Sequence, residues 1–263
     1  MLSHSFTEIL ANAKPGGENI AYFISDNWLQ GRTTYGGMSA ALCLHAGTLL
    51  HAGLPPLRSA QINFVGPASG DVVAKSRILR RGKSVSFLEV ELHGEKGLAT
   101  HAVFCFGEAR ESRLAADFGV KPLPRKRVDC PSFHDPKKQP VFAAQFESLL
   151  VEGDHPVSSS DRNAVMLWIR HRDAAATDLV ALIGVADMPP PAVLPMFRTF
   201  APISSMNWSL NFLSESPVTE DRWWLFESVA EHARDGYSSQ DMRIWNSSGE
   251  LVVTARQNIA IFY

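Results

Sequence analysis

The sequence has few cysteines, almost no excess charge and no long apolar run. Its three cysteines, Cys43, Cys105 and Cys130, lie far apart and lack the spacing of metal ligands, which favours a reducing compartment and no metal site. The formal net charge of −2 gives no reason to expect nucleic acid or an anionic membrane as a partner. Metal-dependent and nucleic-acid-binding classes are therefore disfavoured, and no cofactor is implied.

Targeting signals are also missing. Residues 1–17, MLSHSFTEILANAKPGG, hold no basic region followed by an apolar core, and no apolar run could span a bilayer. With 45% hydrophobic and 20% charged residues, the composition is that of a globular protein. A chain of 263 residues can form one large domain or two of ordinary size. We therefore predict a cytoplasmic protein without membrane partners.

The most distinctive stretch runs from Gly31 to Ala52, where two adjacent glycines lead into a long apolar helix. Gly36 and Gly37 can adopt backbone angles closed to other residues and leave room for a ligand. From Met38 onward the residues are small or apolar, so the helix should be buried. The amides of its first turn carry the positive end of the helix dipole, which suits a carbonyl oxygen or a developing oxyanion.

Two other interpretations of this stretch need no such ligand site. One is a core helix preceded by a glycine turn. The other is a nucleophile elbow, because Gly37-Met38-Ser39 follows a turn and opens a helix. The second residue after Ser39 is Ala41 and not glycine, and the later sequence lacks the strand–helix alternation of an α/β-hydrolase, which disfavours the elbow.

The order of predicted elements repeats along the chain. A capped helix begins at Ser5, with Glu8 at capping-box spacing, and a strand, the long helix and four strands follow it. In the first half the predicted strands are Asn19–Trp28, Arg58–Val65, Val72–Leu79, Ser84–His93 and Leu98–Phe106. In the second half the predicted elements are strands Phe142–Val151 and Ala164–Arg172, helix Ala174–Ala186, and strands Ile203–Phe212, Trp223–Glu231, Ser238–Trp245 and Leu251–Phe262.

A charged, proline-rich segment separates the two repeats, and the predicted boundaries are residues 1–112, a linker over 113–140, and residues 141–263. Short turns make neighbouring strands antiparallel. A duplicated strand–helix–four-strand unit of class α+β is the double hotdog, in which one long curved antiparallel sheet wraps two central helices. Aligning the halves places His101 beside Gln257, each five residues before a phenylalanine.

In this order the sequence resembles the type II acyl-CoA thioesterases and their bacterial relatives. The resemblance covers most of the chain and is carried by Tyr35-Gly36-Gly37, Asn63–Pro67, Leu79–Val85, Ser205–Phe212 and Arg256-Gln257. It implies that a water held between the two halves hydrolyses a fatty or other acyl-CoA thioester without a cofactor. It also implies a homo-oligomer, and exposed sheet edges offer a surface for pairing.

The resemblance also implies which residues form the site. In the family, an aspartate, a hydroxyl residue and a glutamine orient the water, and the glutamine matches Gln257. The aspartate position falls on Asn207, which can orient a water but cannot accept its proton. The hydroxyl position falls near Glu231 and His232, either of which could accept that proton, as could Asp241.

For the carbonyl oxygen, the predicted substrate-binding residues are Tyr35, Gly36 and Gly37. Asp187, before three prolines, is interpreted as a turn residue, and a mirror-image site near it would be built from Asn63 and His101.

Two alternative functions stay open from the sequence. A hotdog hydratase or dehydratase would need an acid–base pair aimed at the acyl chain, and His101 is the best-placed candidate. A non-catalytic acyl-CoA-binding protein is favoured by the amide at Asn207 in place of a carboxylate.

Overall fold

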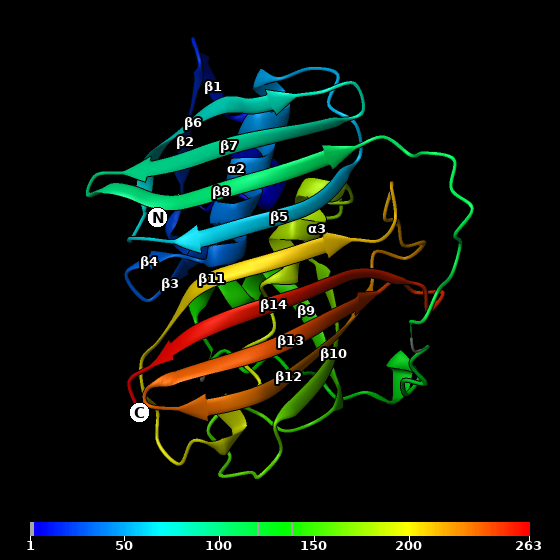
Figure 1. Ribbon diagram of the computed structural model, residues 1–263. Coiled ribbons are helices and arrows are strands. Elements are labelled where there is room, and N and C mark those ends of the chain that lie inside the picture. Colours follow the sequence, from blue (N-terminus) through cyan, green and yellow to red (C-terminus); the bar gives the residue numbers. More distant parts are fainter. Residues whose placement is uncertain (1–2, 120, 138) are drawn as a thin grey trace.

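One long antiparallel sheet runs through both halves of the chain (Figure 1). The computed structural model describes residues 3–119, 121–137 and 139–263. The strands of the first half that enter this sheet are β1 (Lys14–Gly16), β2 (Asn19–Ile24), β5 (Leu57–Phe64), β6 (Gly70–Arg81), β7 (Val85–Gly94) and β8 (Gly97–Gly107). Those of the second half are β9 (Phe146–Glu152), β10 (Ala164–His171), β11 (Ile203–Phe212), β12 (Trp224–Arg234), β13 (Tyr237–Trp245) and β14 (Leu251–Ile261).

The sheet is symmetric in its strand order. The 12 strands follow the order β1-β2-β6-β7-β8-β5-β11-β14-β13-β12-β10-β9. At the centre, β5 pairs antiparallel with β11, with Asn63 opposite Asn207, and this pair joins the two halves. The predicted double hotdog is confirmed. Pairing of chains through the edge strands β1 and β9 stays a prediction.

Two buried helices lie behind the sheet in Figure 1, α2 (Gly36–Leu50) and α3 (Leu179–Ala186). Ten of the fifteen residues of α2 are buried, because the helix carries small and apolar side chains on all of its sides. The predicted burial of this helix is confirmed. The start of α2 faces the end of α3 at very short range. A Cβ atom on Gly37 would lie 2.5 Å from the carbonyl oxygen of Gly184, so only glycine fits there.

Two predicted elements differ from the structure at their starts. Helix α3 begins at Leu179 and not at Ala174, because the Asp178 side chain accepts a hydrogen bond from the Ala181 amide at 2.8 Å and caps the helix. Strand β9 begins at Phe146, after a short 3-10 helix at Val141–Gln145. The predicted capping box of Ser5 and Glu8 is present at the start of α1 (Phe6–Ala11).

The segment between β8 and β9 runs down one side of the molecule in Figure 1 and returns to the outer face of the second half. There the Arg127 guanidinium lies over the rings of Trp168 and Trp223, at 5.3 and 5.8 Å from their centroids. These tryptophans belong to a small second core that also contains Cys130 and Trp245. The rest of the chain packs around one main core.

The fold also contains several short elements. These are a two-stranded hairpin of β3 (Leu29–Gln30) and β4 (Thr33–Thr34), and further 3-10 helices at Asp26–Trp28, Arg127–Asp129 and Leu194–Met196. Within the described residues, neither helix α2 nor any other combines the length and the apolar character that crossing a membrane requires.

The close approach of α2 and α3 predicts a large difference between two glycine substitutions in the same helix. In Gly37→Ala the new methyl group meets backbone, which cannot move aside, and we expect a loss of about 2–4 kcal/mol in the free energy of unfolding. In Gly47→Ala it meets the tip of Leu88, which can rotate, and the gain in helix propensity compensates to within about 1 kcal/mol. Denaturant unfolding of both variants measures the difference, and equal stabilities would contradict the packing described.

Candidate active site

A chain of side-chain hydrogen bonds converges on Asp187, the residue that ends α3. The Gln257 amide nitrogen donates to Asp187 Oδ1 at 2.9 Å and to Ser205 Oγ at 3.0 Å. Gln257 is buried on the inner face of β14, whereas Asp187 and Ser205 keep some contact with solvent. A carboxylate, a hydroxyl group and an amide therefore meet at a partly buried point between α3, β11 and β14.

Asp187 lies in an environment that favours its neutral form. Desolvation by the surrounding protein raises its pKa to about 7, and the hydrogen bonds from Gln257 and from the Gly37 amide work in the opposite direction. Its position at the C-terminus of α3 is unfavourable for a negative charge, while the N-terminus of α2 in front of it is favourable. The result is a carboxyl group that changes charge near neutral pH.

The two glycines before α2 make room for this carboxyl group. A Cβ atom on Gly36 would lie 2.6 Å from Asp187 Oδ2 and 3.1 Å from the Phe64 ring. The Gly37 backbone lowers the pKa of the same carboxyl group. Tyr35 is buried, and its hydroxyl donates to the Gly184 carbonyl at 2.9 Å. Tyr35 thus fixes α2 against α3, and the glycines form the floor of the site.

A β-bulge in β11 decides which residue of that strand meets Gln257. Ser205 pairs with Ile259 and Asn207 with Asn258, so Met206 is an extra residue without a partner on β14. Simple alternation would put Ser205 and Asn207 on the same face of the sheet. The bulge instead turns the Ser205 side chain inward, to Gln257, and leaves Asn207 on the exposed outer face.

Of the four residues predicted to be catalytic, the structure brings only Gln257 into this site. Asn207 is exposed, and its Oδ1 accepts from the Asn258 amide at 3.3 Å. Glu231 and His232 are exposed on β12, and Glu231 pairs with Arg256 at 2.5 Å. The expected placement of these three residues beside Gln257 is corrected, because outward positions of the strands cannot reach the inner face.

The mirror-image site predicted from Asn63 and His101 is also absent from the inner face. Asn63 is exposed, and His101 Nε2 lies 2.9 Å from Glu89 Oε1 within an ion-pair network on the outer face. On the inner face of β7 and β8, Leu88, Val90, Ala102 and Phe104 are buried and apolar, and Thr100 is a buried hydroxyl residue on the same face. A histidine-based acid–base pair at His101 therefore does not face the helices.

Asp187 and Ser205 are the site residues that sequence reasoning missed. Asp187 was interpreted as a turn residue, although an acidic residue directly after an apolar helix opposes the helix dipole, and that conflict was a signal. Ser205 lay within the segment that carries the family resemblance, but the bulge beside it has no mark in the sequence. In residues 3–119, 121–137 and 139–263, no three potential metal ligands come together.

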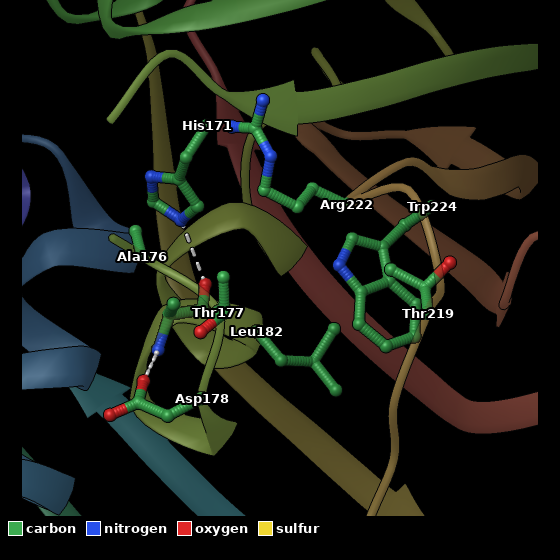
Figure 2. Close-up of a pocket in the computed structure, with 9 residues that line it drawn as sticks. His171, Ala176, Thr177, Asp178, Leu182, Thr219, Arg222 and Trp224 are labelled. Carbon is green, nitrogen blue, oxygen red and sulfur yellow. Dashed lines mark hydrogen bonds between the residues drawn. The ribbon is translucent and has the colours of Figure 1, made fainter. Parts of the chain in front are cut away.

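A separate small pocket lies at the opposite end of α3 (Figure 2). It is lined by His171, Asp178, Leu182, Arg222 and Trp224, among others. Burial lowers the pKa of His171 to about 4, so the neutral ring donates through Nε2 to the Ala181 carbonyl at 2.9 Å. This pocket does not include Asp187 or Gln257, and His171 is the last residue of β10.

Comparison with known proteins places both halves in one family. A model described as the acyl-CoA thioesterase N-terminal domain matches residues 24–107, and one described as the C-terminal domain matches residues 127–261. An uncharacterized protein of Mycobacterium tuberculosis is 25% identical over 89% of this chain and 88% of its own length.

Solved structures share the fold. A hot dog protein of unknown function from Alicyclobacillus acidocaldarius has a TM-score of 0.88 at 21% identity, covering 100% of this chain and 99% of that one. An acyl-CoA thioesterase II from Mycobacterium marinum has a TM-score of 0.78 at 17% identity, with 98% of each chain covered. With family models matching both halves, the chain belongs to the acyl-CoA thioesterase family.

Proposed function

We propose that this protein hydrolyses an acyl-CoA thioester with a water that Asp187, Ser205 and Gln257 hold at the start of α2. The observation that carries the proposal is the single Gln257 amide group that binds both the carboxyl oxygen of Asp187 and the hydroxyl of Ser205. The family's set of aspartate, hydroxyl residue and glutamine is then met by these three residues, with Asp187 in the position expected of Asn207.

The chemistry assigns one task to each group. The ionised Asp187 takes a proton from the water, whose oxygen attacks the thioester carbonyl carbon. As the tetrahedral intermediate collapses, the carbon–sulfur bond breaks and the thiolate leaves with that proton from Asp187. The products are a carboxylic acid and free coenzyme A thiol. Gln257 and Ser205 orient the water, and a pKa near 7 suits a general base at neutral pH.

The carbonyl oxygen needs a donor as negative charge develops on it. The donor that supports the proposal best is the Gly36 amide, which at the first helical position has no acceptor within its own helix. The dipole of α2 adds to this stabilisation. Acyl-chain length, cytoplasmic location and oligomeric assembly stay predictions.

Asp187→Asn should remove the base, keep the size of the side chain and leave one oxygen to accept from Gln257. We expect turnover to fall by about 10²–10⁴-fold, as for loss of a general base, measured as thiol release from acyl-CoA substrates of several chain lengths. Asp178→Asn, at the other end of α3, is the matched control, because asparagine caps a helix as well as aspartate does. Full activity of Asp187→Asn would exclude Asp187 as the base, and acyl-CoA binding by a wild type without any turnover would favour the binding-protein alternative.

The rate should depend on pH through Asp187. Because the ionised carboxylate is the active form and desolvation raises its pKa to about 7, kcat/KM should rise with pH and reach half its plateau near pH 7. Thiol release measured from pH 5 to 9 under kcat/KM conditions tests this expectation. A profile that stays flat through this range would mean that another group, or none, supplies the base.

The raised pKa of Asp187 also predicts that the inactive variant Asp187→Asn has a higher free energy of unfolding than the wild type at high pH. Between about pH 4 and 7 folded Asp187 holds a proton that the unfolded chain releases, so the wild type loses stability as pH rises through this window. Asp187→Asn lacks this loss. Above pH 7 we expect it to be more stable than the wild type by about 1–3 kcal/mol, since one pKa unit is about 1.4 kcal/mol and partial exposure screens the charge. Denaturant unfolding at pH 4.5 and pH 8 checks whether the difference grows with pH, and a constant difference would contradict it.

A further inference from the structure

The hydrogen-bond chain does not end at Gln257 but continues into the protein interior. The Gln240 amide nitrogen donates to Gln257 Oε1 at 2.9 Å, and the Ala192 backbone N–H donates to Gln240 Oε1 at 2.9 Å. Gln240 and Gln257 are cross-strand partners on β13 and β14, and both are buried. Gln240 touches neither Asp187 nor Ser205 through the hydrogen bonds described.

The hydrogen-bond series has a fixed donor-to-acceptor direction, because the backbone N–H at its start can only donate. The Ala192 N–H requires an oxygen, so the oxygen of Gln240 must face it and its NH2 group must face Gln257. That NH2 group in turn requires the oxygen of Gln257, which leaves the Gln257 NH2 group to face Asp187 and Ser205. Without this constraint either end of the Gln257 amide could face the site.

The first donor of the hydrogen-bond series, Ala192, is held close in sequence to its last acceptor, Asp187. Pro189–Pro191 carry no N–H, so Ala192 is the first backbone donor after Met188. The prolines also restrict the backbone between Asp187 and Ala192. The hydrogen bonds and these few residues therefore form a closed ring that begins and ends on the segment after α3.

We propose that Gln240 is a positioning residue that holds the Gln257 amide with its donor side toward Asp187, and so keeps Asp187 a usable base. The inference rests on the proposed function of the Asp187 site. The titratable side chain near Asp187 is Tyr35, at the start of α2, and it is neutral because burial and the Asp187 charge raise its pKa further above its usual value. The other groups that face the site are the uncharged Gly184, Ser205 and Gln257, from α3, β11 and β14. Gln240 on β13 therefore acts on the Asp187 carboxyl group through hydrogen bonds of uncharged groups, with Gln257 between them.

The test replaces Gln240 with methionine, which keeps length and apolar volume but neither donates nor accepts as an amide does. We expect the pKa of Asp187 to rise by about half a unit or more, because Gln257 is no longer held as a donor to its ionised form. We also expect kcat at pH 7 to fall by about tenfold with KM within about twofold, since only the chemical step uses the base. Gln61→Met, on the exposed face of β5, is the control and should change neither quantity.

Carboxyl carbon NMR of ¹³C-labelled aspartate reads the pKa of Asp187 without any substrate, and Asp187→Asn identifies its signal. In a Gln257→Met background, Gln240→Met should shift that pKa no further. The same shift in both backgrounds, or no shift in a folded Gln240→Met, would overturn the proposal. A wild type that hydrolyses no acyl-CoA but shows the Gln257-dependent shift would overturn the proposed function and leave the positioning role supported.

Gln240→Glu supplies a second variant if the methionine variant does not fold. The protonated carboxyl group can accept from Ala192 and donate to Gln257, so the variant should match the wild type while that group is neutral. It should lose activity when that group ionises, because two carboxylates then compete for one Gln257 NH2 group. Carboxyl carbon NMR shows where the introduced group ionises, and wild-type activity of Gln240→Glu at a pH where that group is ionised would overturn the proposal.

Discussion

The close contact between the N-terminus of α2 and the C-terminus of α3 is the constraint on which the site depends. Glycine at positions 36 and 37 lets the start of α2 pack directly against the Gly184 carbonyl and the carboxyl group that ends α3. The Asp187 charge is unfavourable for its own helix and favourable for the facing one. The environment that sets the pKa of Asp187 therefore requires both α2 and α3, and neither half of the chain alone would provide it.

Polar residues on the two faces of the sheet make different kinds of interaction. On the outer face, Glu89 forms a partly buried ion pair, and Glu231 forms an exposed one of the kind that contributes little to stability. On the inner face the second half has one connected series of polar groups, from Ala192 through Gln240 and Gln257 to Asp187. In the first half the inner face of β7 and β8 is mostly apolar at Leu88, Val90, Ala102 and Phe104, and the described site lies in the second half of the duplicated fold.

Sequence reasoning predicted the architecture well because its signals are local. Alternation, turn residues and the apolar stretch after Gly36 follow from one strand or helix at a time, and the repeat then implies the joined sheet. The site depends on non-local geometry. The bulge at Met206 puts Ser205 and Asn207 on opposite faces of the sheet. Asp187, which follows the last residue of α3, becomes part of the site by packing against the start of α2, about 150 positions earlier in the sequence. Gln257 was predicted because a motif at the chain end marked it.

The most direct test is a crystal structure of the wild-type protein with an acyl-CoA analogue in which a methylene group replaces the thioester sulfur, so that hydrolysis cannot occur. We expect the analogue's carbonyl carbon to lie at the start of α2, about 3–3.5 Å from a water bound by Asp187 and Gln257. A carbonyl group bound elsewhere, for example beside His171 and Arg222 at the opposite end of α3, with no water or ligand at Asp187, would contradict the proposed site.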